Sequence, residues 1–384
     1  MEQIVIDVTP LSIKPSGISF YIANLIRCLS TLQYQENFEL ALVYQPRLRN
    51  WLCCRLEFPN SLSRYSNCYF LPLPVRITNI ILDYFPQIFS SHLAHYLDSP
   101  TLIHGTNYTV FPYPNSLKVM TIYDLTFIKY PHYIDSVVKT YSRRVKKCLK
   151  WADLVITISE SSKNDIIKYL NVNPDRIHVT SLASRYSCDH LLIPPNSSVN
   201  YDFFHPYILF VSTIEPRKNV TTLISAFNYL KQKHKIEHHL ILIGQKGWYY
   251  KPIFAAIDNS PWTHHIHHLN YLSDEDVAFF YSKADVFAYP SHYEGFGLPV
   301  LEAMTLGTPV VTSNTSSLPE VAGDAALLIN PNDPIQLAEA ILKIISDTQL
   351  CQDLIQKGKE RAKLFSWEKT AKETLNAYKS LLSS

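Results

Sequence analysis

The feature that most restricts the fold is a repeated alternation between short aliphatic runs and longer amphipathic stretches. Strands buried on both faces of a parallel sheet read as short continuous apolar runs, and the amphipathic stretches between them fit crossover helices. The alternation runs through both halves of the chain and predicts an α/β protein with parallel sheets. The predicted strands lie at 3–7, 38–44, 102–105, 118–124, 154–159, 176–180, 207–213, 239–244, 264–269, 285–289, 309–313 and 326–330.

Helices are predicted where apolar residues recur with helical spacing or where a start signal precedes such a stretch. A last helix is expected to begin near Ser366, a good N-cap residue before Trp367, and to run to about Leu382. The other predicted helices lie at 17–32, 134–151, 160–169, 219–233, 273–283, 298–306, 334–347 and 350–363.

The length of the chain indicates two domains, because 384 residues exceed the roughly 250–300 at which a single core stops growing. The stretch 186–207 is rich in Pro, Asn and Ser without a clear period, which is typical of a linker. Two open parallel sheets that face each other bind ligands in the crevice at the carboxyl ends of their strands. We therefore predict Rossmann-like domains at 1–190 and 207–365, a linker at 191–206 and a C-terminal helical segment at 366–384.

Composition excludes several classes of protein. Hydrophobic residues make up 47% of the chain and charged residues 18%, which describes an ordinary globular protein and neither a disordered nor a fibrous one. No apolar run approaches the ~18 residues of a membrane-spanning helix, and the first residues read as a strand instead of a secretion signal, so we expect a cytoplasmic protein. The seven cysteines are odd in number and lack C-x-x-C spacing, which argues against a disulfide framework.

Positive charge is concentrated in the first half of the chain. Residues 1–200 carry 19 Lys and Arg against 14 Asp and Glu, whereas the remainder carries 16 against 19. Much of the excess lies between Lys139 and Lys150 (KTYSRRVKKCLK). This stretch is either a solvated helix face or a surface that attracts anionic lipid headgroups or a phosphate-bearing acceptor. A dedicated nucleic-acid binder would have a more basic chain than a pI of about 8.0 indicates.

The most informative segment is YPSHYEGFGLPVLEAMTLGTPVVTS at 289–313. A strand ends, a loop with Glu294, Gly295 and Gly297 follows, and a helix is expected to begin near Leu298. Glycines before a helix N-terminus leave backbone N–H groups exposed and allow a close approach, so this loop is suited to an anion. Glu302 falls about one turn into that helix, and its carboxylate therefore lies at the other end of a small pocket from Glu294.

Two carboxylates at opposite ends of one pocket suit a sugar nucleotide, with a ribose at one end, a hexose at the other and a diphosphate between them. Either Glu alone reads equally well as a salt-bridged loop acid or a helix-surface acid. A second segment, VSTIEPRKNVTTLISAF at 211–227, places Arg217 and Lys218 just after a strand that ends at Thr213. Adjacent cations there are placed to hold a diphosphate, or are an ordinary exposed basic pair.

Together these segments resemble the retaining glycosyltransferase family 4, which has the GT-B fold. The resemblance is dense from about 207 to 380 and includes FVSTIEPRKN, LIGQKG, the E-x7-E pair of Glu294 and Glu302, and FSWEKTAKETLNAY. It is looser in the first half, where it rests on IDVTPLSIKPSGISFYIANLI, LIHGTNYTVFP, TIYDLTFIKYP and WADLVITISESSKNDI. More narrowly, the chain is similar to the mannosyl- and rhamnosyltransferases that build bacterial surface polysaccharides. The resemblance also implies a C-terminal helix that crosses back to the N-terminal domain.

The resemblance implies a role for each matching residue. Glu302 would hold the ribose hydroxyls and Glu294 the donor hexose, while Arg217 and Lys218 would neutralise the leaving diphosphate. His104 and Asp124 would face the reacting sugar and the acceptor. The remaining donor-binding residues that it implies, by backbone amide or close approach, are Gly17, Thr213, Gly295, Phe296, Gly297 and Leu298.

The expected reaction is transfer of a hexose, with mannose or rhamnose favoured, from a nucleoside-diphosphate sugar to a glycan or lipid-linked glycan. GDP-mannose is the favoured donor and a UDP-sugar remains open; no cofactor is expected. Two cations and a helix N-terminus stabilise the leaving phosphate without a metal, and retention without an obvious nucleophile suggests front-face attack. His264, His265, His267 and His268 alternate along one predicted strand, so their side chains point to opposite faces of the sheet. This arrangement argues against a metal site.

Two other hypotheses stay open at this point. A sugar-nucleotide epimerase on a related two-domain scaffold would convert the donor without an acceptor. A non-catalytic partner subunit would be expected to lack the carboxylate pair or Arg217 and Lys218, and this chain retains all four. The expected location is the cytoplasm, with peripheral contact to the inner face of the membrane through the stretch from Lys139 to Lys150.

Overall fold

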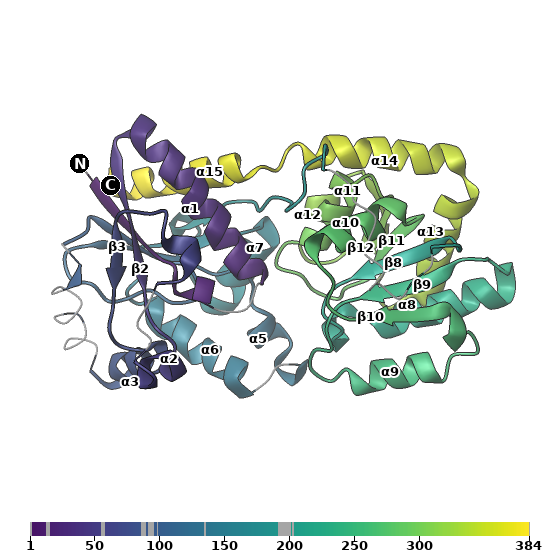
Figure 1. The fold of residues 1–384 in the computed structure, drawn as a ribbon, viewed down its shortest axis with the longest axis horizontal. Coiled ribbons are helices and arrows are strands. Elements are labelled where there is room, and N and C mark those ends of the chain that lie inside the picture. The colour runs from purple at the N-terminus through teal and green to yellow at the C-terminus, as the bar shows by residue number, and fades with distance from the viewer. Residues whose placement is uncertain are drawn as a thin grey trace.

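The computed structural model describes residues 2–12, 16–54, 58–85, 90, 96–97, 99–133, 136–190, 201 and 203–383. They form two lobes, each built on one parallel sheet (Figure 1). Residues 191–200 and 202 of the predicted linker lie outside the described residues. No described helix is long and apolar enough to cross a membrane.

The first lobe contains a seven-stranded sheet in the order β3-β2-β1-β4-β5-β6-β7, with every neighbouring pair parallel. Its strands are β1 (Glu2–Asp7), β2 (Phe38–Tyr44), β3 (Cys68–Phe70), β4 (Leu102–Gly105), β5 (Leu117–Thr121), β6 (Leu154–Thr157) and β7 (Ile177–Val179). Its helices are α1 (Gly17–Glu36), α2 (Leu48–Leu52), α3 (Val75–Tyr84), α5 (Thr126–Lys129), α6 (Ser136–Cys148) and α7 (Glu160–Leu170).

The second lobe contains a six-stranded parallel sheet in the order β10-β9-β8-β11-β12-β13. Its strands are β8 (Tyr207–Val211), β9 (His239–Ile243), β10 (Ile266–Leu269), β11 (Val286–Tyr289), β12 (Val310–Ser313) and β13 (Ala326–Ile329). Its helices are α8 (Val220–Tyr229), α9 (Lys251–Asp258), α10 (Asp274–Lys283), α11 (Leu298–Thr305), α12 (Leu318–Ala322), α13 (Pro334–Ser346) and α14 (Thr348–Ala362).

Each sheet reverses its strand order at one place, between β1 and β4 in the first lobe and between β8 and β11 in the second. Loops that leave such a switch point in opposite directions open a crevice at the carboxyl ends of the strands. The loops that carry Arg217 and Glu294 follow β8 and β11, so both lie at the switch point of the second sheet.

The last helix crosses between the lobes. The chain leaves α14 on the second lobe and continues as α15 (Trp367–Leu382) against the first lobe (Figure 1). There α15 packs on α1 and β5, and the Trp367 Nε1 atom donates to the Ser184 carbonyl at 3.1 Å. The predicted crossing is therefore confirmed.

The predicted strands are all present within a few residues, and the differences concern short elements. The strand predicted at 264–269 begins at Ile266, because Thr263–His265 form a 3-10 turn. Short elements carry too few residues for a period to show, and the sequence therefore did not indicate them. The unpredicted elements are β3, α2, α3, α5, α9 and α12.

Candidate functional site

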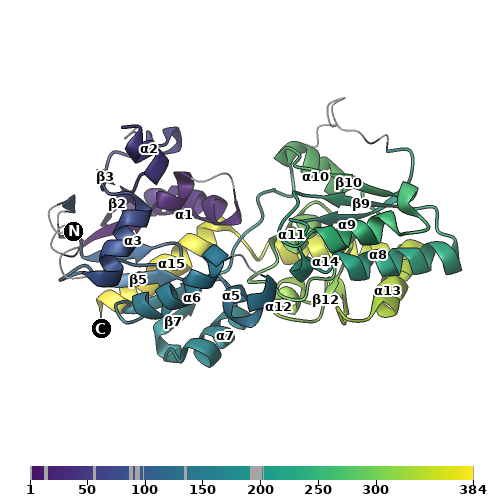
Figure 2. The same cartoon turned by 90° about the horizontal axis from the view of Figure 1, so that it is seen from below.

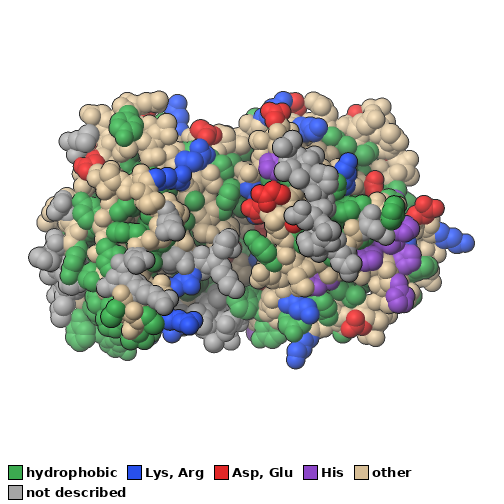
Figure 3. All heavy atoms as spheres, in the orientation of Figure 1, with side chains coloured by type: hydrophobic (Ala, Val, Ile, Leu, Met, Phe, Trp, Pro, Cys, Tyr) green, Lys and Arg blue, Asp and Glu red, His purple; other side chains and the backbone are tan. Residues whose placement is uncertain are grey.

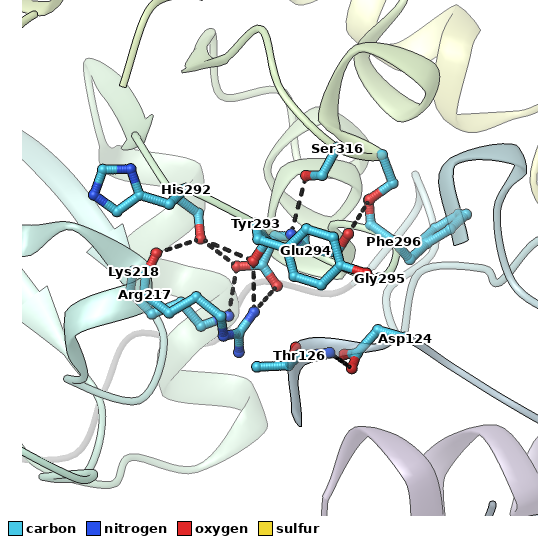
Figure 4. Close-up of polar contacts among 12 residues, drawn as sticks. Asp124, Thr126, Arg217, Lys218, His292, Tyr293, Glu294, Gly295, Phe296 and Ser316 are labelled. Carbon is cyan, nitrogen blue, oxygen red and sulfur yellow. Dashed lines mark hydrogen bonds and ion pairs between the residues drawn. The ribbon is translucent and has the colours of Figure 1, made fainter. Parts of the chain in front are cut away.

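Two adjacent cations after β8 converge on one carboxylate after β11 (Figure 4). Arg217 Nη1 lies 3.0 Å from Glu294 Oε2, and Lys218 Nζ lies 2.6 Å from Glu294 Oε1. The side-chain amide of Asn219 donates to the carbonyls of Pro290 and Pro331 at 3.0 and 2.6 Å, which ties the two loops together. The structure therefore brings these three predicted residues into one cluster.

The Glu294 carboxylate is nearly saturated with donors. Its Oε1 atom accepts hydrogen bonds from Lys218 Nζ, from the Tyr289 hydroxyl at 2.9 Å and from the Ser291 hydroxyl at 2.6 Å. Burial raises the pKa of Glu294, but Arg217 and Lys218 outweigh it and lower that pKa to about 2. The carboxylate is therefore ionised, and its Oε2 atom, which accepts from Arg217, keeps room for one further donor.

Both cations are held in a largely buried setting. Burial and the neighbouring Arg217 lower the pKa of Lys218, although Glu294 counteracts them. Burial works against the charge of Arg217 as well, yet Glu294 and Glu215 raise its pKa on balance. Glu215 Oε1 lies 2.8 Å from Arg217 Nη2 and is itself buried. The cluster therefore combines two cations with two carboxylates, and these ion pairs fix the positions of both cations in the loop after β8.

The glycines of the loop before α11 have different physical roles. Gly297 has φ +119°, a conformation that side chains disfavour, and it is the N-cap of α11. A Cβ atom on Gly295 would lie 2.9 Å from the Tyr123 carbonyl oxygen in the opposite lobe. The Ser317 hydroxyl donates to the carbonyls of Glu294 and Phe296 at 2.9 and 2.6 Å and thereby shapes the turn.

A second helix N-terminus faces α11 from the other lobe. Helix α1 begins at Gly17 after Ser16, whose hydroxyl accepts from the Ser19 amide at 3.2 Å in a capping box. Among the described residues, a Cβ atom on Gly17 would meet Leu298 Cδ1, at 4.0 Å. Both helix dipoles therefore place their positive ends at the same gap, next to Arg217 and Lys218.

Glu302 lies inside the second lobe and is engaged by an arginine from the segment after β7. Arg185 Nε lies 2.7 Å from Glu302 Oε1, and Arg185 Nη1 lies 2.7 Å from Asp274 Oδ1. The Tyr281 hydroxyl is 3.4 Å from Glu302 Oε2. Burial raises the pKa of Glu302, and Arg185 only partly offsets the rise. With 2% of its surface exposed, Glu302 meets solvent only where Arg185 moves aside.

Asp124 and Arg217 line the same cavity, of about 340 Å³, between the lobes. Asp124 follows β5, and its Oδ1 atom accepts from the Thr126 amide at 2.9 Å (Figure 4). Ile18 of α1 and Trp248 line the same cavity. The structure therefore places Asp124 and Arg217 at one cavity, and the role of Asp124 towards the sugar and the acceptor stays a prediction.

His104 is not at the cavity, and the prediction that it faces the reacting sugar is wrong. The ring is fully buried; its Nδ1 atom lies 2.6 Å from the Tyr378 hydroxyl of α15 and its Nε2 atom 2.7 Å from Thr121 Oγ1. Burial lowers the pKa of His104 to about 3, so the ring is neutral. It lies on β4, whose side chains alternate between the two faces of the sheet. His104 points towards α15, so it serves to pack that helix against the sheet.

Thr213 and the basic stretch from Lys139 to Lys150 lie outside the cluster around Glu294. Thr213 is an exposed residue after β8, and a Cβ atom on Gly247 would lie 2.6 Å from its Cγ2 atom. Within the basic stretch, whose Lys139 side chain lies outside the described residues, Lys147 donates to the Leu82 carbonyl and Arg144 lines a cavity. The stretch is therefore no uniform solvated face.

The histidines of β10 take part in local packing. His267 Nε2 lies 2.9 Å from His239 Nδ1, and His268 Nε2 lies 2.8 Å from the Gly244 carbonyl. Figure 3 shows histidine side chains gathered at the end of the second lobe that is remote from the first. Among the described residues no group of three or more His, Cys, Asp and Glu is arranged to hold a metal.

Several site residues were not singled out from the sequence. Tyr289 and Ser291 lie inside the segment 289–313, where their place at the end of a strand is a usable signal. Glu215 lies two residues before Arg217 in the same loop. Arg185 carried no signal, because the stretch around it has no period and its partners are distant in sequence.

Comparisons with known proteins agree with this geometry. The family model of glycosyl transferases group 1 matches residues 204–361. The O-antigen chain mannosyltransferase B of Escherichia coli is 36% identical over 286 residues, which cover 73% of this chain and 74% of that protein.

Solved structures share the architecture. Sucrose-phosphate synthase from Thermosynechococcus elongatus aligns over 100% of both chains with a TM-score of 0.73 and 20% identity. WaaG, a glycosyltransferase involved in lipopolysaccharide biosynthesis, aligns over 97% of this chain and 98% of its own, with a TM-score of 0.69 and 15% identity. These likenesses confirm the predicted GT-B fold.

Proposed function

Because this chain belongs to the glycosyl transferases group 1 family and is therefore a hexosyltransferase, we propose that it transfers mannose from GDP-mannose to a glycan or lipid-linked glycan. Its similarity to an O-antigen chain mannosyltransferase favours mannose and a role in lipopolysaccharide O-antigen or other surface polysaccharide synthesis. Rhamnose as the sugar and a UDP-sugar as the donor are the alternatives that the tests below address.

The observation that carries the proposal is the convergence of four positive features on one gap. Arg217 and Lys218 come from one loop, and the N-termini of α1 and α11 come from opposite lobes. A Cβ atom on Gly17 would make an ordinary contact with Leu298 Cδ1 at 4.0 Å, so the N-termini of the two helices lie close together at this gap. A diphosphate is the part of a sugar nucleotide that such a gap suits.

The chemistry follows from the charges. As the sugar–phosphate bond breaks, negative charge grows on the diphosphate, and the fixed cations stabilise it without reorganisation. These cations supply the electrostatic stabilisation that a divalent metal supplies in other enzymes, so the proposed reaction is metal-independent. We assign no nucleophile on the donor side and propose transfer with retention by front-face attack, in which the leaving phosphate accepts the proton of the acceptor hydroxyl.

The two carboxylates then have separate roles. Glu294 orients Arg217 and Lys218 and offers the remaining lone pair of Oε2 to a donor hexose hydroxyl. Glu302 accepts the ribose hydroxyls once Arg185 gives way, because Arg185 now covers its Oε1 atom.

A thermal-shift panel with GDP-, UDP-, ADP- and dTDP-sugars, with and without EDTA, tests the proposal. We expect the nucleotide sugars of one base to raise the unfolding temperature selectively, because only the folded protein binds them. This rise is expected to persist in EDTA. A rise with none of the nucleotides, or one that needs a divalent ion, contradicts the proposal. NMR of the transferred linkage tests retention.

Variants test the division of roles. Glu302→Ala is expected to weaken binding of the bare nucleoside diphosphate, whereas Glu294→Gln is expected to spare it and weaken binding of the sugar nucleotide. Glu360→Gln, on the exposed face of α14, is the matched control. Equal losses for both ligands in both variants would refute the division. Conversion of the donor into another sugar nucleotide without any acceptor would instead favour the epimerase hypothesis.

Cytoplasmic location and peripheral contact with the inner face of the membrane remain part of the proposal. Arg143, Lys146 and Lys150 are the exposed described cations of the basic stretch and are the residues available for such contact. Sedimentation with anionic vesicles, compared between the wild-type protein and a variant with glutamine at these three positions, measures it.

A further inference from the structure

The largest described cavity of the first lobe lies at the switch point of its sheet. It has a volume of about 930 Å³ and is bordered by Asp7 at the end of β1, Gln45 after β2 and Asn107 after β4. Ligands of open α/β sheets bind at this place. The donor site described above uses the switch point of the other sheet, so this cavity is free for a second substrate.

Four arginines line the cavity, and none of them has a carboxylate partner among the residues that the structure describes. Arg47 is the N-cap residue of α2, Arg49 lies in α2, Arg76 in α3 and Arg144 in α6. The single acid among the described lining residues is Asp7, whose Oδ1 atom already accepts from the Thr9 amide at 2.9 Å. Burial raises the pKa of Asp7, which weakens its power to neutralise the arginines. Among the described lining residues positive charge therefore exceeds negative charge, and it is supplied by planar donors that match phosphate oxygens.

The cavity continues towards the donor site. Tyr108 and Tyr141 line both it and the smaller cavity that contains Asp124 and Arg217. Their rings stack with centroids 5.9 Å apart, and the guanidinium of Arg144 lies 5.7 Å from the Tyr141 ring. A molecule held by the arginines can therefore extend a hydroxyl past these tyrosines to the reacting sugar.

An apolar stripe leads away from the cavity on its other side. Arg76, Ile80 and Tyr84 are spaced by four residues and so share one face of α3. Ile80 and Tyr84 are 59% and 73% exposed, and Leu52 at the end of α2 is 68% exposed. Figure 3 shows hydrophobic side chains gathered over α2 and α3. Exposed apolar residues in such a group mark an interaction surface.

We propose that the arginine-lined cavity binds the phosphate or diphosphate of the acceptor and that the apolar stripe on α2 and α3 binds its lipid chain. This inference rests on the proposed function, since it names the chemistry of the acceptor for that reaction. The order along the molecule is donor sugar, acceptor sugar beside Tyr108 and Tyr141, phosphate at the arginines, and lipid on the stripe. The Asp7 carboxylate accepts a hydrogen bond from a hydroxyl of the acceptor sugar.

Binding of a short lipid diphosphate tests the proposal without knowledge of the acceptor sugar. The full-length protein is first saturated with the nucleoside diphosphate that stabilises it, so that Arg217 and Lys218 are occupied. Farnesyl diphosphate, farnesol and inorganic diphosphate are then titrated in separate calorimetric experiments, below the concentration at which the lipid forms micelles. We expect farnesyl diphosphate to bind at least about tenfold more tightly than farnesol or inorganic diphosphate. The covalent link lets one molecule make the lipid contacts and the diphosphate contacts together.

Matched variants locate the binding. Arg144→Gln and Arg76→Gln are expected to weaken farnesyl diphosphate and inorganic diphosphate by about tenfold or more, because each loses a charge-assisted hydrogen bond. Ile80→Ser is expected to weaken farnesyl diphosphate and farnesol only. Arg143→Gln, the exposed neighbour on α6 outside the cavity, is the control and is expected to change neither.

Three results would overturn the inference. Equal effects of Arg143→Gln and Arg144→Gln would show that general charge attracts the ligand. Equal affinity for inorganic and farnesyl diphosphate would assign the cavity to a phosphorylated acceptor without a lipid. The protein could also bind anionic phospholipid vesicles. If Arg76→Gln and Arg144→Gln weaken that binding as strongly as they weaken binding of farnesyl diphosphate, the surface is a membrane contact. Each of these results differs from failure of the proposed function, because the first titration shows whether the protein binds the nucleotide.

Discussion

At the scale of single residues, the three glycines around the gap have different reasons to be glycine. Gly297 adopts a backbone conformation that other residues disfavour, and Gly295 touches the opposite lobe. Gly17 has neither constraint, since only Leu298 lies within 4.0 Å of its Cβ position. In the proposed donor site, close approach of the ligand is therefore the reason for a glycine at position 17.

This difference predicts opposite outcomes for two alanine substitutions. Gly17→Ala is expected to leave the unfolding temperature unchanged or to raise it, because alanine restricts the unfolded chain, and to weaken sugar-nucleotide binding. Gly295→Ala is expected to keep each lobe folded but to lower turnover by about tenfold or more, because its Cβ atom would lie 3.0 Å from Asp124 Cβ and hold the lobes apart. Thermal unfolding and steady-state kinetics measure both. Unchanged turnover in Gly295→Ala would contradict the argument.

The sequence predicted site residues well where a motif is local and poorly where a side chain's direction decides. Arg217, Lys218 and Glu294 share two short loops, and their clustering follows from the parallel topology. His104 was assigned to the site wrongly, since a strand position alone does not tell which face of the sheet the ring occupies. Arg185 reaches Glu302 across 117 positions, a pairing that no spacing indicates.

At the scale of elements, α15 is held against β4 and β5 by a buried polar contact as well as by apolar packing. The Tyr378 hydroxyl and Thr121 Oγ1 occupy both ring nitrogens of His104. Tyr378, Ala371 and Leu375 are the buried face of the helix in this region. The amphipathic pattern of 366–382 was visible in the sequence, but the identity of the sheet that it covers was not.

This contact predicts a pH-dependent stability. The pKa of His104 is about 3 in the folded chain, below the ordinary value of 6.5, so the unfolded chain takes up a proton first. The stabilising contribution is therefore complete above pH 6.5 and is lost as the pH falls towards 3. His104→Gln is expected to lower the free energy of unfolding at pH 7 by about 1–3 kcal/mol because two buried partners lose a matched ring.

Urea unfolding between pH 7 and 4.5 measures the effect. The wild-type free energy of unfolding is expected to fall with decreasing pH more steeply than that of His104→Gln, by up to about 1.4 kcal/mol per pH unit for one proton. His132→Gln, at an exposed position, is the control. Parallel curves for wild type and His104→Gln would show that folding does not lower the pKa of the ring.

At the scale of the whole molecule, polar contacts between the lobes hold the gap narrow. The Tyr293 hydroxyl in the second lobe donates to Asp165 Oδ2 of α7 at 2.8 Å. The Glu320 carboxylate of α12 accepts from the amides of Glu160 and Ser161 at 2.9 and 3.3 Å, where α7 begins. Figure 2 shows α7 and α5 beside α12 at the junction. Two lobes joined by a few polar contacts are expected to move relative to each other.

The two-lobe architecture itself was predictable because each lobe repeats the same rhythm of strand and helix. The arrangement of the lobes was not, since it depends on contacts such as Ser159 Oγ to the Gly295 carbonyl, at 2.7 Å. The residues involved are common polar types without a motif. Only the three-dimensional packing identifies them as a joint.

Weakening this joint is expected to open the molecule. The double variant Tyr293→Phe, Glu320→Ala loses four hydrogen bonds between the lobes, two from each side chain. At roughly 1 kcal/mol each, their loss shifts the balance between closed and open forms by about tenfold or more. Small-angle X-ray scattering of the ligand-free protein is expected to show a larger radius of gyration than for the wild type. Addition of the nucleoside diphosphate is expected to reverse the increase, because in the proposed donor site α1 and the Arg217 loop contact it from opposite lobes.

The control for this opening is a variant that breaks a polar contact inside one lobe. Glu36→Ala removes the ion pair between Glu36 of α1 and Lys379 of α15, both on the first lobe. If that variant expands as much as the double variant, the increase reflects partial unfolding and no hinge. If the double variant keeps the wild-type radius, the polar contacts are a consequence of closure, and apolar packing around Phe296 and Leu298 holds the lobes together.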